Sequence, residues 1–473
     1  MKILLINPPA AENKMLIREG RCTQEASFWA TLWPPLTLVT IAALLEREGH
    51  EARVIDCAAS GMDARHLLSE AMSLGPSLVI FSTATASIEY DLLLAVEVKK
   101  MCGGNVVVAA LGTHVSIMAE ECLAQGPGLD CIMRNEPEMT CLDLARAIAS
   151  KGHFDGILGL SFRDSSGEII HNPDRPFIED LDSLPIPAWH LIDRNLYRLP
   201  LKGKPFVMVN PVRGCPYNCT FCTSRIYYGA KLRSRSLGSV LKEILYVKDR
   251  FGINDIFFWS DTYTLDKAYV KEMCRGMIKT KLDISWIANS RVDTIDPEAL
   301  KLMKEAGCWM ISLGIESGSQ RILDEAKKGI RIEQAVDAVR MAHDANLLVT
   351  GHFIFGLPGE TEETIRETIR FMNRLRLDLV QLYSAVPFPG TELYNMAVKG
   401  GWIEGAAWSD FRQDNVLMNL PTIRAEEVDR WIKKAVRTFY LKPRSIVRLM
   451  AIMKAVNKPY ALRSALAFAK RFL

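Results

Sequence analysis

The sequence predicts an α/β fold in three parts: a doubly wound Rossmann-like domain, a partial (β/α)6 TIM-type barrel and a helical C-terminal extension. Short apolar runs alternate with helical stretches over residues 1–150, and the alternation resumes over residues 205–395. Between them, residues 151–204 contain the proline-rich crossing Leu184–Trp189, which is typical of a domain boundary. The extension covers residues 396–473. A chain of 473 residues also exceeds one ordinary core, which agrees with several domains.

Repeated βα units are predicted for residues 1–150. Their strands are continuous apolar runs, which predicts a parallel sheet covered by helices on both faces. The expected strands are Lys2–Ile6, Ala52–Asp56, Leu78–Ser82, Val106–Leu111 and Cys131–Arg134, and the expected helices are Leu36–Glu48, Ala64–Leu74, Ile88–Met101, Val115–Ala124 and Thr140–Ala149. In the linker region, a small hairpin is expected from Leu158–Arg163 and Glu168–His171.

Small or polar loops follow four of these strands. Ligands of parallel sheets bind beyond the carboxyl ends of the strands, so these loops are candidate binding sites. No G-x-G-x-x-G motif is present, and dinucleotide binding is therefore not supported. The candidate residues are Asn7, Pro8, Ser82, Thr83, Gly112, His114 and Glu136.

The second series of βα units fits a partial TIM-type barrel. In barrels, functional residues lie on the loops that follow the strands, and each expected strand here is followed by polar or glycine-rich residues. The expected strands are Phe206–Val209, Asp255–Trp259, Ile284–Ile287, Trp309–Leu313, Leu348–Phe355 and Leu379–Ser384, with helices that include Leu237–Phe251, Pro297–Ala306, Ile332–Asn346 and Glu362–Leu375.

Three cysteines in one short loop give the strongest chemical signal. Cys215, Cys219 and Cys222 follow C-x3-C-x2-C spacing after the first strand of the barrel. Thiolates bind iron–sulfur clusters and zinc, and three protein ligands leave one metal position open. The alternatives are a structural zinc site, which requires four closed ligands, or three buried cysteines.

The cysteine loop and the segments after later strands resemble those of radical S-adenosylmethionine (SAM) enzymes. The supporting segments are Gly314–Ser319, Gly351–Thr361 and Val386–Glu392. The resemblance implies that the three cysteines hold a 4Fe–4S cluster and that SAM chelates its fourth iron. One-electron reduction then cleaves SAM to a 5′-deoxyadenosyl radical. An electron donor such as flavodoxin or ferredoxin is implied as well.

The same resemblance implies roles in SAM binding for residues close to the cysteines and to the next two strands. Phe221 is expected near the adenine, and Asp261 with Thr262 near the amino group. For Asp261, an Asx-turn before the next helix is the alternative. Arg291 is expected to pair with the carboxylate, because a guanidinium fork matches a carboxylate in shape.

Residues after the fourth and fifth barrel strands complete the expected SAM site. Glu316, in a loop with Ser317, is expected to accept hydrogen bonds from the ribose hydroxyls. Lys328 is expected to face the SAM carboxylate, or alternatively to be a solvated lysine at a helix end. His352 matches a position that approaches the ribose or the nucleobase.

Residues 1–150 resemble the cobalamin-binding domain that precedes many radical SAM barrels. The chain lacks the D-x-H-x-x-G motif that supplies a histidine ligand to cobalt in some of these domains. His114 is the nearest candidate, and we expect it to be a loop histidine near the corrin or its tail rather than a cobalt ligand. The resemblance therefore adds cobalamin to the predicted cofactors.

Composition limits the partners and the compartment. A net charge of +3 is too small to indicate nucleic-acid binding. Eleven cysteines, with no signal sequence or long apolar run, predict a reducing cytoplasm and no membrane span. A helix is expected over Glu426–Arg448, and Arg444–Leu473 is basic and amphipathic, which predicts either peripheral membrane contact or a helical cap over the barrel.

Two reactions suit this architecture. The first, which we favour, is methylation of an unactivated carbon by way of cobalamin. The second is radical-driven cyclisation or ring rearrangement of a tetrapyrrole-like or lipid-like substrate, because the chain also resembles the anaerobic Mg-protoporphyrin ester cyclase type. A non-catalytic iron–sulfur electron-transfer or sensor protein is the alternative from another class. The substrate, whether a small molecule or lipid-like, has no motif in the sequence.

Overall fold

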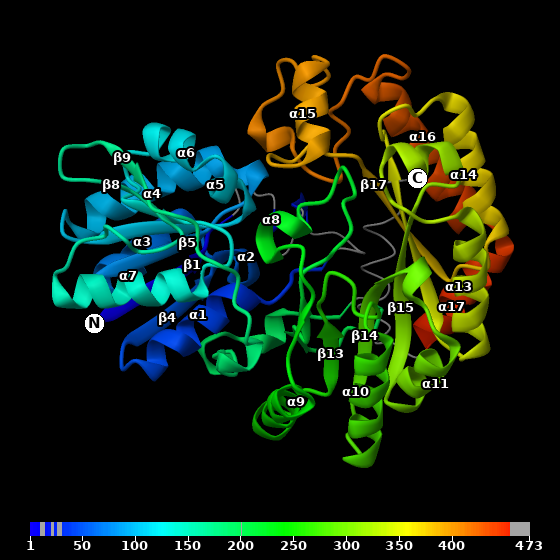
Figure 1. Cartoon of the computed structure of the whole chain (residues 1–473), viewed down its shortest axis with the longest axis horizontal. Coiled ribbons are helices and arrows are strands. Elements are labelled where there is room, and N and C mark those ends of the chain that lie inside the picture. Colours follow the sequence, from blue (N-terminus) through cyan, green and yellow to red (C-terminus); the bar gives the residue numbers. More distant parts are fainter. Residues whose placement is uncertain (10–14, 20–22, 26–30, 200, 455–473) are drawn as a thin grey trace.

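Two large sheets with their covering helices form most of the described part of the chain (Figure 1). The computed structural model describes residues 1–9, 15–19, 23–25, 31–199 and 201–454. The first sheet has seven strands in the order β4-β1-β5-β6-β7-β8-β9, and the second has six strands in the order β10-β13-β14-β15-β16-β17. The predicted α/β class and the order of its two units are therefore confirmed.

The first unit is doubly wound. Strand β1 (Lys2–Asn7) pairs in parallel with β4 (Glu51–Asp56) on one side and β5 (Leu78–Ser82) on the other, and β6 (Val107–Leu111) and β7 (Cys131–Met133) follow. Alternate side chains of β1 enter two different hydrophobic cores. One core lies under the first and last helices of the unit, and the second core lies under the helices between them. The helices are α1 (Leu36–Arg47), α2 (Cys57–Ser60), α3 (Ala64–Leu74), α4 (Ile88–Cys102), α5 (Thr113–Ile117), α6 (Ala119–Gln125) and α7 (Glu138–Ser150).

Two details of this unit differ from the sequence prediction. The helix expected over Val115–Ala124 is two helices, because the backbone leaves helical geometry at Met118 (φ −102°, ψ 35°). The predicted hairpin forms as β8 (Leu160–Arg163) and β9 (Ile169–His171), but it is not a separate linker element. It continues the first sheet, since β8 pairs antiparallel with β7.

The second unit is an open barrel of parallel strands, each hydrogen-bonded to the next in chain order. Its strands are β10 (Phe206–Val209), β13 (Asp255–Phe258), β14 (Ser285–Arg291), β15 (Cys308–Glu316), β16 (Leu348–Phe355) and β17 (Leu379–Ser384). The helices are α8 (Ser224–Tyr228), α9 (Leu237–Phe251), α10 (Lys267–Lys279), α11 (Pro297–Glu305), α12 (Gln320–Glu325), α13 (Ile332–Asp344) and α14 (Glu362–Arg374). Side-chain caps set several helix starts, as at Ser236 before α9 and Thr361 before α14.

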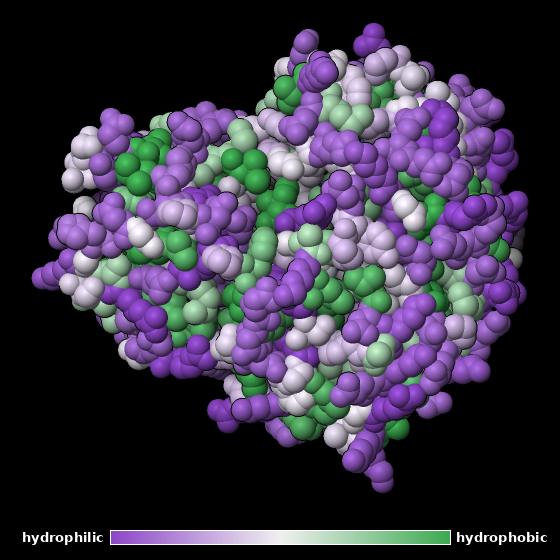
Figure 2. Space-filling view, viewed as in Figure 1, coloured by the Kyte–Doolittle hydropathy of each residue, from purple (hydrophilic) through white to green (hydrophobic). Residues whose placement is uncertain are grey.

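Short strands and terminal helices connect the two units. Strands β11 (Val212–Arg213) and β12 (Arg233–Ser234) form a two-stranded ladder around the cysteine loop, and α8 lies between the two units (Figure 1). Strands β2 (Leu16–Ile17) and β3 (Gln24–Glu25) form another such ladder. The space-filling view shows mostly hydrophilic outer surfaces, with apolar groups gathered in the notch between the units (Figure 2).

The single helix predicted over Glu426–Arg448 is wrong. After α15 (Glu392–Lys399), helix α16 (Ala425–Tyr440) ends and α17 (Pro443–Lys454) begins, because Pro443 cannot continue the helical hydrogen bonding. The described part of the chain holds no helix long and apolar enough to cross a membrane. The basic residues that motivated the membrane hypothesis lie mostly outside the described residues: Lys458, Arg463, Lys470 and Arg471.

Candidate active site

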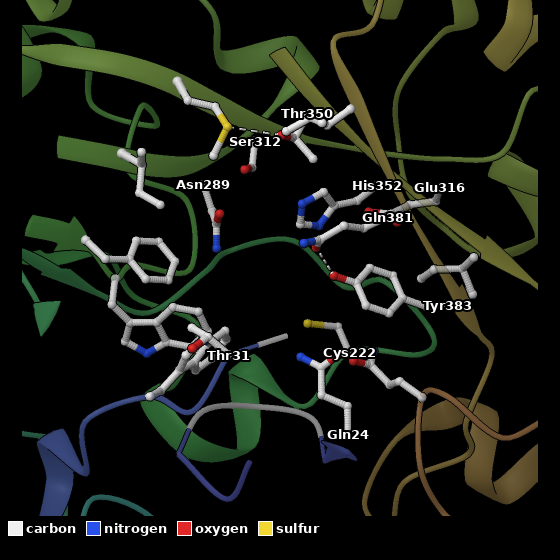
Figure 3. A pocket seen from close by; sticks show the side chains of 18 of the residues that line it. Gln24, Thr31, Cys222, Asn289, Ser312, Glu316, Thr350, His352, Gln381 and Tyr383 are labelled. Atoms are coloured by element: carbon white, nitrogen blue, oxygen red, sulfur yellow. Dashed lines mark hydrogen bonds between the residues drawn. The ribbon is translucent and has the colours of Figure 1, made fainter. Parts of the chain in front are cut away.

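A cavity of about 240 Å³ lies inside the barrel (Figure 3). Alternate residues of the strands line it, which is the periodicity expected for one face of a sheet. Its deeper part is apolar, with Phe206, Phe257 and Met310, while Cys222 and Glu316 stand at its mouth. Polar side chains lie between these two levels: Asn289, Ser312, Thr350, His352, Gln381 and Tyr383.

The cysteine loop is held by its own backbone and by the next strand's loop. Gly214 has φ +90°, and a Cβ there would lie 2.1 Å from the Lys231 carbonyl oxygen, so only glycine fits. Its N–H donates to Asp261 Oδ2 at 2.9 Å. The Cys215 N–H donates to the Gly229 carbonyl at 3.1 Å. These contacts fix the start of the loop over the barrel mouth.

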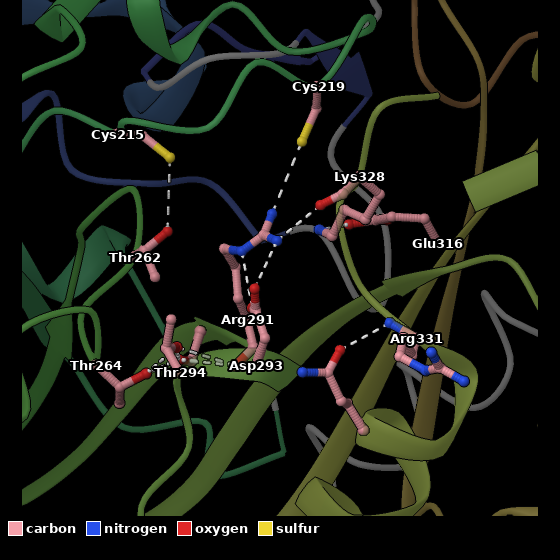
Figure 4. Close-up of polar contacts among 12 residues, drawn as sticks. Cys215, Cys219, Thr262, Thr264, Arg291, Asp293, Thr294, Glu316, Lys328 and Arg331 are labelled. Atoms are coloured by element: carbon pink, nitrogen blue, oxygen red, sulfur yellow. Dashed lines mark hydrogen bonds and ion pairs between the residues drawn. The ribbon is translucent and has the colours of Figure 1, made fainter. Parts of the chain in front are cut away.

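The three thiols face that mouth. Cys215 Sγ lies 3.8 Å from Thr262 Oγ1, and Cys219 Sγ lies 3.8 Å from Arg291 Nη1 (Figure 4). Cys222 lines the cavity itself (Figure 3). The sequence prediction that the triplet belongs to one site at the top of the barrel agrees with this placement.

The donor set is three thiols from one loop. Thiolates are the ligands of iron–sulfur clusters. A structural zinc site takes four closed ligands, and the loop supplies three. The three thiols therefore fit a 4Fe–4S cluster with one iron left open.

Arg291 is the centre of a polar network beneath the thiols (Figure 4). Its guanidinium forms two 2.9 Å bonds to Asp293, donates to the Lys328 carbonyl at 2.7 Å and lies 3.4 Å over the Tyr217 ring. Burial opposes its charge, but Asp293 and Cys219 raise the Arg291 pKa above its ordinary value. Because one carboxylate already occupies the fork, Arg291 offers its Nη1 edge toward the cysteines.

Lys328 and Glu316 form a buried ion pair at the cavity mouth. Their Nζ and Oε1 atoms lie 2.6 Å apart, and Lys328 is 5% exposed. The alternative of a solvated helix-end lysine is therefore wrong. A Cβ on Gly314 would lie 2.6 Å from the Glu316 carboxylate, so this glycine makes room for the pair. Burial lowers the Lys328 pKa, but Glu316 and Cys219 more than offset this and raise it.

The remaining predicted SAM residues divide into two groups. Phe221 and His352 line the cavity, and Thr262 lies beside Cys215. Ser317 lies apart, because its hydroxyl is hydrogen-bonded to Thr368 of α14 at 3.0 Å and is fully buried. Asp261 holds the Gly214 N–H rather than capping the next helix, which Asp266 caps.

Several site residues were not predicted. Tyr217 and Asp293 orient Arg291, and Asn289, Gln381 and Tyr383 line the cavity wall. For the wall residues a signal existed, since each lies in a strand at an inward-facing alternate position. Tyr217 and Asp293 had no such signal, because their importance depends on contacts made in space.

The carboxyl edge of the first sheet differs from the cavity mouth. Ser82, Thr83 and Gly112 do meet there, but the remaining cavity is only about 10 Å³ because Arg18 and Glu19 fill the edge. Arg18 is fully engaged, with Asp91 Oδ1 at 3.1 Å and the Pro8 carbonyl at 2.7 Å.

The residues at this edge are polar and suit the border of a large polar ligand. The cavity, however, is too small to hold such a ligand. The hydroxyls of Ser82 and Thr83 border the small cavity, and Asn7 Oδ1 is buried there without a hydrogen-bond partner. A corrin needs far more room than the present cavity of about 10 Å³.

Two predicted cobalamin residues point away from this edge. His114 is buried, with its ring 4.7 Å from Trp408, and it lines a separate cavity between α4, α6 and Trp408. Burial lowers its pKa to about 4, so it is neutral at physiological pH. Glu136 is engaged by Arg213 and Arg233 of the second unit. Neither side chain lines the small cavity at this edge.

Comparisons with known proteins agree with this architecture. The radical SAM superfamily model matches residues 209–372, and the B12-binding domain model matches residues 29–145. An uncharacterised methyltransferase of Pyrococcus horikoshii is 34% identical over 448 residues, which cover 95% of this chain and 94% of the relative. An anaerobic magnesium-protoporphyrin IX monomethyl ester cyclase of Rubrivivax gelatinosus is 27% identical, covering 76% and 66% of the two chains.

A solved structure shares the fold across both units. The radical SAM methyltransferase TsrM from Kitasatospora setae, with tryptophan and a SAM analogue bound, has a TM-score of 0.67 at 20% identity. The match covers 85% of this chain and 77% of that chain. The order of a B12-type sheet before an open barrel is therefore a shared architecture.

Proposed function

We propose that this chain, which belongs to the radical SAM superfamily and carries a B12-binding domain, methylates an unactivated carbon of a small molecule. It uses a 4Fe–4S cluster, SAM and cobalamin. When bound, these groups supply a 5′-deoxyadenosyl radical that removes a hydrogen atom and a methyl group that replaces it. The cyclase relative keeps radical-driven cyclisation as the competing reaction.

The protein's own groups bind, orient and protect. Cys215, Cys219 and Cys222 hold the cluster at the barrel mouth. The charged groups beneath them, Arg291 and Lys328, are placed to orient the carboxylate of SAM, in keeping with the strength of charge-assisted bonds. The apolar floor of the cavity excludes water, which protects a reactive radical from side reactions.

One observation carries the proposal: three thiols stand beside a cavity that has polar side chains on its wall and an otherwise largely apolar lining. An electron-transfer protein needs the thiols but not the cavity. A cavity directly beside an open cluster corner offers room for the substrate that receives the radical.

Product analysis tests the proposal. The protein is reconstituted anaerobically with iron, sulfide and cobalamin, then given SAM, dithionite and candidate substrates. Formation of 5′-deoxyadenosine together with a product heavier by one CH₂ supports methylation. A product of unchanged carbon count that has lost hydrogen supports cyclisation. Iron and sulfide without any 5′-deoxyadenosine supports the electron-transfer alternative and overturns the proposal.

The partners follow from the chemistry. Cluster reduction requires a one-electron donor, and a flavodoxin or ferredoxin of a reducing cytoplasm is the proposed class.

Peripheral membrane contact has one supporting observation, the exposure of Val447 and Met450 on α17 at 66% and 55%. Flotation with anionic vesicles tests it, and binding that does not depend on salt or on these residues counts against it.

A further inference from the structure

A buried ionic cluster joins the two units beside the cysteine loop. Arg213 Nη1 lies 3.1 Å from Glu136 Oε1, and Arg213 Nη2 lies 2.8 Å from Glu138 Oε1. Arg233 Nη1 lies 2.8 Å from the other oxygen of Glu136. All four side chains are at most 7% exposed. The carboxylates belong to the B12-binding unit and the guanidiniums to the barrel unit.

The position of the arginines relates this cluster to the cysteines. Arg213 stands two residues before Cys215, with Gly214 between them. It is paired directly across the β11–β12 ladder with Arg233, so two positive charges face each other. Like charges opposite each other in a ladder repel. Glu136 bridges the two guanidiniums, and the ladder that starts the cysteine loop therefore depends on a carboxylate from the other unit.

The other end of the loop is attached to the first unit as well. Helix α8 begins two residues after Cys222, and its Tyr227 hydroxyl lies 3.3 Å from Thr37 Oγ1. Thr37 in turn donates to Glu19 Oε1 at 2.9 Å. The Tyr228 carbonyl accepts a 2.6 Å bond from Arg233. Both flanks of the cysteine loop are thus held by residues of the first unit.

Stability alone is a poor explanation for this arrangement. Removing four charges from water is costly, and apolar side chains of similar volume often serve as well or better. What buried, hydrogen-bonded pairs add is a single defined geometry. An exposed pair nearby, between Glu179 and Lys231 of the segment that joins β11 to β12, has 65% and 71% of its side chains accessible and contributes little energy.

We propose that Glu136 and Glu138 are positioning residues, through which the B12-binding unit fixes the cysteine loop of the barrel and the environment of its cluster. They act through Arg213 and Arg233 and touch no reacting atom. The inference rests on the proposed function, since it takes the three cysteines as the cluster ligands.

Spectroscopy of the reconstituted full chain tests the inference. We compare wild type, Glu138→Gln, the double variant Glu136→Gln/Glu138→Gln, and Glu179→Gln as the matched control. Glutamine keeps the shape and removes the charge. We expect Glu138→Gln to change the electron paramagnetic resonance spectrum of the dithionite-reduced cluster. Release of iron to a chelator should become faster by roughly tenfold, as for residues that support metal ligands. Glu179→Gln should match wild type in both measurements.

Further variants separate positioning from folding. Glu138→Asp keeps the charge and should restore part of the wild-type spectrum. Combining Arg213→Gln with Glu138→Gln should add less than the sum of the two single effects, because one acts through the other. If the double glutamate variant does not fold, the spectrum and the iron-release rate of Glu138→Gln alone decide whether these glutamates position the loop.

Two results would overturn the inference in distinguishable ways. A folded Glu138→Gln protein with wild-type spectrum and iron-release rate removes the positioning role and leaves the proposed function intact. A wild-type protein that takes up no iron and sulfide removes the proposed function and this inference together.

Discussion

The two parallel sheets end in edges of opposite character. The barrel edge opens on a cavity of about 240 Å³ beneath three thiols, whereas the edge of the first sheet retains about 10 Å³. At the barrel, side chains stand around the space, as Cys222 and His352 do. At the first sheet, Arg18 and Glu19 occupy the space. Polar residues after strands therefore mark both edges, but they do not tell which edge is open.

The two edges differ in cavity volume because different segments lie over them. In the barrel, the inward side chains of the strands surround an open space. Across the first sheet runs the segment that contains β2, whose neighbour Arg18 reaches Asp91 of α4. The ion pair between Glu138 and Arg213 connects the two units, although each unit has its own cavity at its sheet edge.

The largest effect is expected at the open edge. Cys222→Ser replaces a soft thiolate with a hydroxyl that is a poor iron ligand. We expect 5′-deoxyadenosine formation to fall to the level of a protein-free control, measured by chromatography after anaerobic reconstitution. Cobalamin binding by the first unit should persist. Cys102→Ser, at the end of α4 and far along the chain from the loop, is the control. Equal activity in the two variants would refute the cluster assignment.

Breaking the ion pair at the same edge should be the next largest effect. Lys328→Met leaves the Glu316 carboxylate buried without its cation, which costs about 3–5 kcal/mol of unfolding free energy. Urea denaturation of the apoprotein measures it. Adding Glu316→Gln should recover most of the loss. Arg321→Met breaks an exposed pair with Glu325 and should cost less than about 0.5 kcal/mol. Equal losses would show that Lys328 is not buried.

Much of the fold could be predicted because local patterns determine it. Helix α3 (Ala64–Leu74) and strand β16 (Leu348–Phe355) have the predicted bounds, since a side-chain cap begins the helix and apolar residues stand at both ends of the strand. Strands β14 and β15 run further than predicted, because each continues its ladder on the other as far as Arg291 and Gly314. That extension depends on a partner strand and has no local signal.

The site shows the same division. The family resemblance predicted that Cys219, Arg291 and Lys328 belong to one site, and the structure brings these three residues together. The role of Glu136 could not, because its partners, Arg213 and Arg233, come from a distant segment. Its position after β7 indicated only a candidate for the first edge.

A smaller effect is expected from the closed edge. Gly112 has φ +137°, and a Cβ there would lie 2.4 Å from the Thr83 carbonyl oxygen. We expect Gly112→Ala to cost about 3 kcal/mol, from backbone strain and overpacking together. Thermal and urea unfolding measure it. Gly329→Ala is the control, with positive φ but nothing within 4 Å of its Cβ, and should cost about 1 kcal/mol. A reversed order would show that the edge is not packed as described.

The smallest effect depends on pH and reports on what fills the closed edge. Burial raises the pKa of Glu19 from 4.5 to about 7, against the bonds from Thr37. Between about pH 4.5 and pH 7, the folded protein thus keeps the Glu19 proton that the unfolded chain has lost. The stability from Glu19 is complete below about pH 4.5 and is lost as the pH rises through about 7.

Glu19→Gln keeps the acceptor for Thr37 and removes the titration. We expect the variant to match wild type near pH 5 and to be more stable by about 2 kcal/mol at pH 8. Urea midpoints at both pH values measure this. Other buried acids, such as Asp91 and Glu360, titrate in both proteins and cancel in the difference. A difference that is the same at both pH values would mean that Glu19 reaches water, and that the first edge is as open as the barrel mouth.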